Sequence, residues 1–406
     1  MKALWEHDGP TWTLRLGLHP EDPVTGRGQG TSSVGLLVRE ATVELPVSVP
    51  DPHPDLEAFA ALVIARPWIK RRLVVRRGVS RGFATVVERM MRIELSPVDD
   101  GLSERSPGDV PLLAYSAGYD STAVSVLLPD IPHIHHRRVP HPRVVDRAIN
   151  WRADALERLA LRAGSRGRDL HIVRANFEYL VHGWPTLPHW YAFAVGPLLM
   201  ADSMHGGSLV FGGTLETYYM DNGKIWKGAG KGDPLPASLG LPVMRPLAGI
   251  TEIGAMKLVL DSDLADAARS CTLGTLTKPC HACAKCIRKD MLIAAIRQKR
   301  AKLPPEAPGW TSVQGDLPYY MQAQLEYATS RLQVADGPVA RLRERLGNPK
   351  PQETEWMNRA YRPAVDVAVP VPWRARVHTA IEEKLGWMDD EDMAMAHSWD
   401  RTQDVS

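Results

Sequence analysis

Short apolar runs separated by proline, glycine and aspartate fill the first hundred residues of the chain. Runs of this kind are typical of β-strands bounded by turns. They occupy 11–18, 32–38, 41–49 and 71–78. A polar stretch at 99–109 follows them and is typical of a linker. We therefore expect residues 1–105 to form a β-rich N-terminal domain.

From residue 110 the pattern changes to apolar runs of strand length that alternate with segments of helical spacing. Strands are expected at 111–115, 131–135, 170–177 and 208–213. Helices are expected at 120–128, 143–163 and 190–204. This alternation predicts an α/β fold in which helices cover both faces of a parallel sheet. Sheets of this kind bind ligands beyond the carboxyl ends of their strands.

A second proline-rich stretch, LPPEAPGW at 303–310, is expected to be another linker. The residues beyond it are mostly of helical character, with an acidic segment at 389–392. The chain is therefore expected to have three parts, which are the N-terminal domain, a core at 110–300 and a mainly helical C-terminal extension at 303–406.

The most informative local pattern is AYSAGYDSTA, in which a buried strand leads through small residues into a helix. Ser116, Ala117 and Gly118 allow a tight turn whose backbone N–H groups can face an anion. Asp120 is expected to cap the helix that follows. If position 117 needs a positive φ, its alanine costs on the order of 1 kcal/mol.

Hydroxyl groups of Ser116, Ser121 and Thr122 add further donors to this loop. The loop lacks the lysine that a Walker A loop places on the β- and γ-phosphates. Such a cradle suits an enzyme that holds pyrophosphate as a leaving group. An ordinary strand-to-helix turn without a ligand is the alternative interpretation.

Four cysteines lie close together in the spacing C-x8-C-x2-C-x2-C. They are Cys271, Cys280, Cys283 and Cys286. Four thiolates form a closed tetrahedral Zn²⁺ site, which is structural because no position is left for a substrate. Basic residues surround them and are expected to compensate the charge: Lys278, His281, Lys285, Arg288 and Lys289. An iron–sulfur cluster and four unrelated buried thiols remain as alternatives.

Composition excludes several classes of protein. With 44% hydrophobic and 24% charged residues, the chain is neither disordered, collagen-like nor stapled by disulfides. No segment has the roughly 18–20 apolar residues that span a bilayer, and the N-terminus has no apolar signal region. The four cysteines also argue against a secreted framework. We expect a cytoplasmic protein with no membrane partner.

The net charge of +2 gives no indication of nucleic-acid binding, so only a local patch could do so. One basic run could hold a phosphate backbone. It comprises Arg66, Lys70, Arg71, Arg72, Arg76, Arg77 and Arg81. A solvated strand or a dock for an acidic partner is the preferred interpretation. The histidines at 133, 135 and 136 are expected at most to line a site.

The loop resembles the SGGxDS signature of the PP-loop ATP pyrophosphatases, with Ala117 in place of the first glycine. Together with the cysteine string SCTLGTLTKPCHACAKCIRK at 270–289, it resembles the 7-cyano-7-deazaguanine synthase (QueC) family. RPLAGITE at 245–252 also looks like a segment of that family, whereas GGTLETYYMD at 212–221 agrees poorly with its substrate loop. The resemblance covers about 110–297.

The resemblance implies a PP-loop sheet with ATP, Mg²⁺ and Zn²⁺ as cofactors. ATP would bind at Ser116, Ala117, Gly118, Tyr119, Asp120, Ser121 and Thr122, of which Asp120 and Ser121 would be catalytic. The substrate pocket would be bordered by His182, Gly213, Thr214 and Glu216. The family adenylates the carboxylate of 7-carboxy-7-deazaguanine and releases pyrophosphate, after which ammonia gives an amide and then a nitrile.

The long segments on either side of the core are not needed by an ammonia ligase. They favour a likeness to the enlarged QueC-like proteins of antiphage operons, including the Qat and cyclic-oligonucleotide signalling systems. Those proteins are thought to join a deazaguanine to an amine of a partner protein from the same operon, and a homodimer is also in keeping with such relatives. The ammonia-using synthase, a PP-loop RNA-modifying enzyme and a non-enzymatic nucleotide sensor are the alternatives. Thiolation is disfavoured because all four cysteines are assigned to the metal.

Overall fold

A computed structural model describes residues 1–28, 33–142, 147–181, 186–220, 232–271, 274, 279–300, 303–315, 318–332 and 336–400. The chain is an α/β protein with a ten-stranded, mostly parallel sheet, many helices and a cluster of four cysteines. It divides into two compact units. The first contains Met1–Ser116, Ile131–Val210 and Gly232–Met244, and the second contains Ala117–Asp130, Phe211–Lys231 and Arg245–Ser406.

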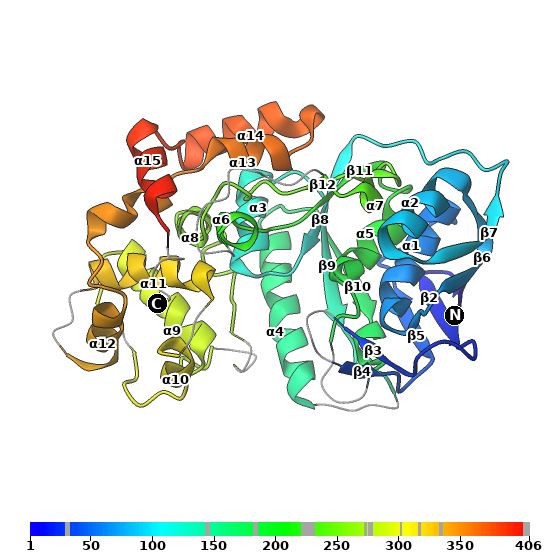
Figure 1. Cartoon of the computed structure of the whole chain (residues 1–406), viewed down its shortest axis with the longest axis horizontal. Helices are drawn as coiled ribbons and strands as arrows, with labels where there is room; N and C mark the ends of the chain where they lie inside the picture. Colours follow the sequence, from blue (N-terminus) through cyan, green and yellow to red (C-terminus); the bar gives the residue numbers. More distant parts are fainter. Residues whose placement is uncertain are drawn as a thin grey trace. The chain divides into compact units, whose positions relative to one another are not determined.

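One sheet forms the frame of the first unit, in the order β12-β11-β8-β9-β10-β5-β2-β1-β6-β7 (Figure 1). Five neighbouring strands are parallel: β12 (Val243–Met244), β11 (Gly206–Val210), β8 (Val110–Tyr115), β9 (His133–Arg138) and β10 (Leu170–Ala175). The other five are β5 (Glu40–Glu44), β2 (Thr11–Gly17), β1 (Lys2–Asp8), β6 (Arg72–Ser80) and β7 (Glu94–Asp99). The sheet is antiparallel from β10 to β1 and parallel again from β1 to β7. A separate hairpin joins β3 (Thr25–Arg27) to β4 (Ser33–Gly35).

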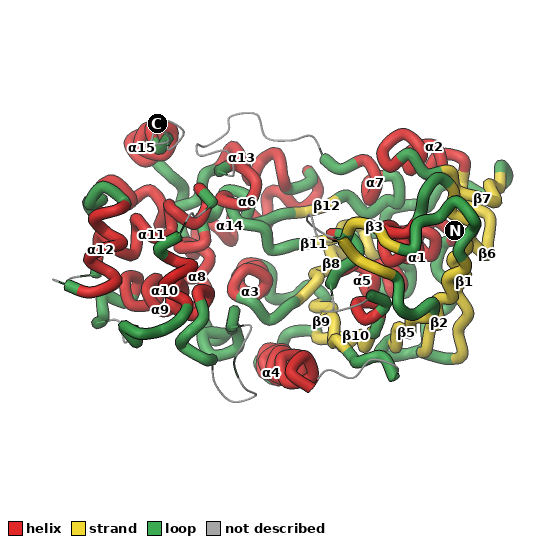
Figure 2. The backbone as a smooth tube through the Cα atoms, turned by 60° about the horizontal axis from the view of Figure 1, so that its bottom comes forward, coloured by secondary structure: helices red, strands yellow, loops and turns green. Residues whose placement is uncertain are grey.

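Helices cover both faces of the parallel part, as the alternating pattern predicts. Figure 2 shows α4 (Arg147–Gly164) on one side of β9 and β10 and α5 (Val195–Met200) on the other. The first unit also contains α1 (Pro54–Ala65), α2 (Arg81–Met91), α7 (Pro234–Ala237) and the 3-10 turns Arg66–Trp68, Phe177–Tyr179 and Trp190–Ala194. The core of this unit therefore lies on the two faces of the sheet.

The expected strands of the first hundred residues are confirmed at β2, β5 and β6. They do not form a sheet of their own, because β5 pairs with β10 of the expected core. The Thr42 N–H donates to Asn176 Oδ1 at 2.7 Å, and the Asn176 N–H donates to the Thr42 carbonyl at 3.1 Å. The expected linker at 99–109 is also anchored, since the buried Arg105 contacts Asp202 at 2.6 Å. The two units thus differ from the three-part organisation expected from the sequence.

The strand order places a topological switch point between β8 and β11. From β8 the chain adds β9 and β10 on one side, and it then returns to add β11 and β12 on the other side. Doubly wound sheets bind ligands at this point, beyond the carboxyl ends of the two strands. The loop that begins at Ser116 follows β8, and the segment that begins at Phe211 follows β11.

The second unit is helical in the part of the chain that the structure describes. Its helices are α3 (Tyr119–Leu127), α6 (Leu215–Tyr219), α8 (Glu252–Leu260), α9 (Ala284–Ile296), α10 (Gly309–Val313), α11 (Tyr319–Arg331), α12 (Gly337–Arg345), α13 (Arg362–Ala368), α14 (Val371–Lys384), α15 (Asp390–Ser398) and the 3-10 segment Pro351–Asn358. Helix α8 packs on α3, and α9 packs on α10 and α11. The helical character expected beyond residue 303 is thereby observed. Among the described helices, none combines the length and the apolar character needed to cross a bilayer.

Candidate functional site

The loop after β8 has the tight geometry that its small residues suggest. Ala117 has a φ of 55°, which is the left-handed conformation considered for it from the sequence. Gly118 is the N-cap of α3, so Asp120 lies in the first turn of the helix and does not cap it as expected. A carboxylate in the first turn still interacts favourably with the helix dipole. The segment therefore turns sharply from the strand into the helix N-terminus.

The segment after β11 contacts the first turn of α3 through Gly212. A Cβ at this position would lie 2.6 Å from the carbonyl carbon of Asp120 and 2.7 Å from the Ser121 nitrogen. Only glycine allows so close an approach of two backbones. From the sequence, the neighbouring Gly213 was predicted to border the substrate pocket, and Gly212 was not considered. The adjacent pair of glycines was the only local sign that the backbone needs close approach here. Ser121 and Thr122 are buried, whereas Asp120 is half-buried.

Glu216, expected to border a substrate pocket, is fully buried and holds the start of α8. Its two carboxylate oxygens accept the Glu252 N–H at 2.7 and 2.9 Å. Burial raises the pKa of Glu216 to about 7, and the charge of Asp120 acts in the same direction. Gly213 and Thr214 are buried beside it. His182 lies outside the described residues.

Lys289 of α9 is a buried cation among these acids. Its ammonium forms an ion pair with Glu252 and lies 5.0 Å from the centre of the Tyr119 ring. Burial lowers the pKa of Lys289 to about 8, although the charges of Asp120 and Glu216 favour its protonated form. The sequence indicated Lys289 only as a charge near the cysteines. Its partners could not be found from spacing, because they lie on other helices.

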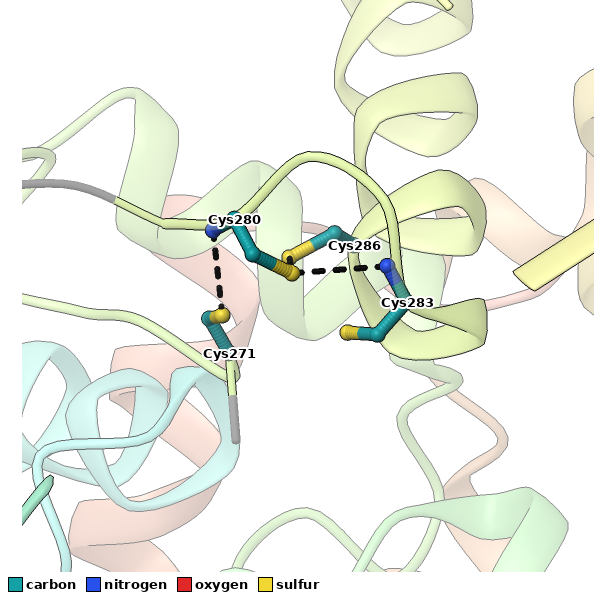
Figure 3. A group of neighbouring side chains, drawn as sticks. All are labelled: Cys271, Cys280, Cys283 and Cys286. Carbon is teal, nitrogen blue, oxygen red and sulfur yellow. Dashed lines mark hydrogen bonds between the residues drawn. The ribbon is translucent and has the colours of Figure 1, made fainter. Parts of the chain in front are cut away.

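The four cysteines come together as their spacing predicts. Their Sγ atoms all lie within 4.8 Å of one another, and Figure 3 shows the side chains converging from the Cys271 segment and the start of α9. The Sγ atoms of Cys280 and Cys286 are 3.7 Å apart. Four thiolates at about 2.3 Å from one Zn²⁺ are separated by roughly this distance. An iron–sulfur cluster would spread the same thiolates over several irons, so the arrangement fits a single ion better.

Backbone donors favour the thiolate form in this cluster. Burial alone would raise the pKa of Cys280, but the N–H groups of Ala282 and Cys283 outweigh it and bring the pKa to about 7. Burial and the neighbouring thiols raise the pKa of Cys286 instead. A bound cation would remove that conflict by replacing the proton. The residues present therefore fit a Zn²⁺ ion.

The basic residues around the cysteines are not all directed at them. Arg288 and Lys289 contact Glu252, and His281 contacts Asp290 at 2.8 Å. Lys285 is exposed, and Lys278 lies outside the described residues. Fewer of these side chains than expected are therefore available to compensate the negative charge of a metal–thiolate site.

A residue that sequence reasoning missed supports the cysteine loop from the expected linker at 303–310. A Cβ at Gly309 would lie 2.4 Å from the Ala284 nitrogen and 2.5 Å from the Cys283 carbonyl carbon. The Gly309 N–H donates to the Ala282 carbonyl at 2.9 Å. The available signal was a glycine in a segment with three prolines, which predicts a turn but does not show which residues that turn contacts.

A cavity of about 70 Å³ opens in the first unit at the carboxyl ends of β8 and β9. Its walls are mostly apolar, with Ser116 and a group of cationic or imidazole side chains at its polar side. They are Ala114, Tyr115, Ser116, Ile134, His135, His136, Arg138, Ala153, Leu156 and Phe193. The first residue of the β8–α3 loop thus lines a cavity at the edge where doubly wound sheets bind ligands.

His135 is one of the residues that line this cavity. Its Nδ1 donates to the Tyr115 carbonyl at 2.9 Å, which leaves Nε2 as the unprotonated nitrogen. This Nε2 is buried and has no hydrogen-bond partner among the residues that the structure describes. Burial lowers the pKa of His135 to about 4, so the ring is neutral near pH 7. The buried Glu178 holds His136 at 3.1 Å and Arg138 at 2.7 Å.

Three of the seven basic residues of the run in the first unit are paired with acids. Arg72 contacts Glu94 at 3.2 Å, Arg77 contacts Glu57 at 2.7 Å and Arg81 contacts Asp100 at 2.9 Å. Cations that are already paired release fewer counterions when they meet a phosphate backbone. Binding of nucleic acid by this run, and its alternatives of a solvated strand or a dock for an acidic partner, stay predictions.

The comparisons with known proteins reach only part of this arrangement. Residues 231–400 match a family of unknown function, DUF6395. The match covers less than half of the chain and includes the cysteines and the C-terminal helices. The match includes residues on both sides of the boundary expected at 303. Helices α10 and α11, which follow that boundary, also pack on α9, which precedes it. The comparison with curated proteins finds no match, and the comparison with solved structures finds none either.

Proposed function

We propose that the protein is an ATP-dependent carbon–nitrogen ligase that forms AMP and pyrophosphate. It would adenylate the carboxylate of a 7-carboxy-7-deazaguanine-type base and transfer the acyl group to an amine of a partner protein. The class of reaction is supported by the site, whereas the base and the acceptor rest on the resemblance to QueC-like proteins.

The observation that carries the proposal is the left-handed turn at Ala117 at the switch point of the sheet. Ala117 at a φ of 55° followed by the Gly118 N-cap directs the chain from β8 into α3. A turn of this kind before a helix N-terminus favours an anionic phosphate. Neither Ser116–Thr122 nor the first turn of α3 contains a lysine, which suits release of pyrophosphate better than γ-phosphoryl transfer.

The first unit also has a cavity, lined in part by Ser116, that suits a planar base. Strand β9 continues to Arg138, beyond the end of its pairing with β8 at His135. A strand edge of this kind can hydrogen-bond a planar base, and the apolar walls can cover its faces.

The chemistry requires few reacting groups from the protein. A carboxylate oxygen of the substrate attacks the α-phosphorus of ATP, the bond to the β-phosphate oxygen breaks, and pyrophosphate leaves. The amine then attacks the acyl carbon, an amide forms, the amine loses a proton and AMP leaves. The loop from Ser116 to Thr122 would hold the phosphates, and Asp120 could share a Mg²⁺ with their oxygens, since Mg²⁺ needs only one or two carboxylates. A Zn²⁺ at the cysteines would be structural.

The test is to incubate the protein with Mg²⁺, ATP and 7-carboxy-7-deazaguanine and to quantify AMP and pyrophosphate. We expect AMP that depends on the carboxylate, and at least a tenfold loss of it in Asp120→Asn, because general positioning groups contribute factors of this order or more. Asp130→Asn is the matched control, since Asp130 follows the same helix and is mostly exposed. ADP as the product, or no turnover, would contradict the proposal.

The mass of the product separates the remaining alternatives. An amide to a protein amine requires the partner to be present, whereas the ammonia-using synthase would release a free nitrile when ammonia is supplied. An RNA-modifying enzyme would instead incorporate label from ATP-activated substrate into RNA. We expect free 7-carboxy-7-deazaguanine to be adenylated without RNA, which an RNA-modifying enzyme would not do.

A further inference from the structure

The cysteine segment contacts the β8–α3 loop from both of its ends. Before Cys271, the Arg269 N–H donates to the Ala117 carbonyl at 3.2 Å, and the charge of Arg269 favours the ionised form of the Tyr119 phenol, although burial raises the pKa of that phenol. After Cys286, one helical turn along α9, the Lys289 ammonium lies over the Tyr119 ring. All of these residues belong to the second unit.

Lys289 is fixed at this place by several contacts. Its ammonium pairs with Glu252 and lies 3.7 Å from Met256 Sδ, and its side chain is only 8% exposed. The Glu252 backbone is in turn held by the Glu216 carboxylate. A buried ion pair loses its compensation when one partner is removed or displaced. Lys289 thus joins Glu252 of α8 to the Tyr119 ring in the first turn of α3.

The position of Lys289 depends in turn on the start of α9. Cys283 is the N-cap of that helix and Cys286 lies in its first turn. Both would be ligands of the ion, and binding of a structural metal orders the segments that carry its ligands. An occupied site thus fixes the turn of α9 immediately before Lys289.

We propose that Lys289 is a positioning residue that couples occupancy of the four-cysteine site to nucleotide binding at Ser116–Thr122. The inference rests on the proposed function in one respect, which is that ATP binds this loop. Coupling between two sites is reciprocal, so the metal strengthens ATP binding by the factor by which ATP strengthens metal binding. The metal site would then be a support of the nucleotide site as well as of the fold.

The experiment follows the release of Zn²⁺ from the metal-loaded full chain to a chromogenic chelator, with and without Mg²⁺-saturated ATP. Wild type is compared with Lys289→Met and with the control Lys285→Met, which removes an exposed lysine of the same helix. We expect ATP to slow release roughly fivefold or more in wild type and in the control, within the usual range of coupling. In Lys289→Met the slowing should be lost, and weak chelation by ATP itself would appear equally in all three proteins.

Equilibrium dialysis of ATP against the metal-loaded wild type tests ATP binding separately from its coupling to the metal. No ATP binding would overturn the proposed function together with the coupling. ATP binding without an effect on metal release would overturn the coupling alone, and coupling retained in Lys289→Met would overturn the role of Lys289. Tyr119→Leu keeps the Lys289–Glu252 pair but removes the aromatic ring over which the Lys289 ammonium lies. It should also weaken the coupling, so this variant decides the matter if Lys289→Met does not fold.

Discussion

Ala117 adopts a backbone conformation that costs an L residue on the order of 1 kcal/mol. Ala117→Gly removes this cost but gives the unfolded chain more freedom, so its free energy of unfolding should stay within about 1 kcal/mol of wild type. Ala117→Val should lower it by roughly 2 kcal/mol, because a β-branched residue is a genuine outlier at positive φ. Urea unfolding of the three proteins measures both effects. Equal stability of the valine and glycine variants would contradict the observed turn.

Glu216 predicts a pH dependence of stability whose sign follows from its raised pKa. Between its ordinary pKa of 4.5 and its folded pKa of about 7, the folded state holds a proton that the unfolded state has lost. The stability contributed by this group is therefore present at low pH and is lost as the pH rises through 7. Relative to Glu216→Gln, wild type should lose about 1 kcal/mol or more of stability between pH 5 and 8. Urea unfolding at several pH values measures this, with the exposed Glu306→Gln as control; parallel profiles of wild type and Glu216→Gln would rule it out.

The residues that could be found from the sequence are those whose chemistry is local. The cysteine spacing and the small residues of the loop each specify a geometry within a few positions of the chain. Glu252, Lys289 and Gly309 acquire their roles only from helices that are distant in sequence. Glu216 shows the same limit, because the sequence could not show that its carboxylate accepts the N–H at the start of α8.

At the scale of elements, the strands and helices of the parallel part were predicted because apolar runs of strand length alternate there with segments of helical spacing. Helix α1 was missed, since it is buried on all sides and its apolar residues show no polar stripe. Such a run cannot be told from a buried strand by periodicity alone. Helix α2 was missed for another reason, because the basic run that precedes it had been considered only as a charged patch.

The junction between α10 and the cysteine loop predicts an effect on the metal from a residue that is not a ligand. In Gly309→Ala the new methyl group would meet the Cys283–Ala284 backbone, which must move. We expect Zn²⁺ release to accelerate several-fold and stability to fall by about 2 kcal/mol, as for other overpacked sites. Gly232→Ala is the control, since no described atom lies within 4 Å of its Cβ position. Unchanged metal release in Gly309→Ala would mean that α10 does not support the site.

At the scale of the whole molecule, the continuity of the sheet was the feature least accessible from the sequence. Each strand of the first hundred residues was visible as an apolar run, but strand partners are set by long-range pairing that leaves no local signal. The antiparallel join of β5 to β10 is made by backbone hydrogen bonds together with Asn176, a residue with no distinctive context. A polar linker at 99–109 therefore suggested two domains where one sheet is present.

This continuity predicts that residues 1–105 cannot be removed without loss of the fold. A chain that starts at residue 107 would lose Arg105, which holds Asp202, and would expose the edge of β10 that β5 covers. An uncovered edge strand pairs with other chains and promotes aggregation. We expect this fragment to be aggregated on size exclusion and to lack a cooperative thermal transition. A monomeric fragment that unfolds cooperatively and keeps its metal would show that the first hundred residues are a separable domain after all.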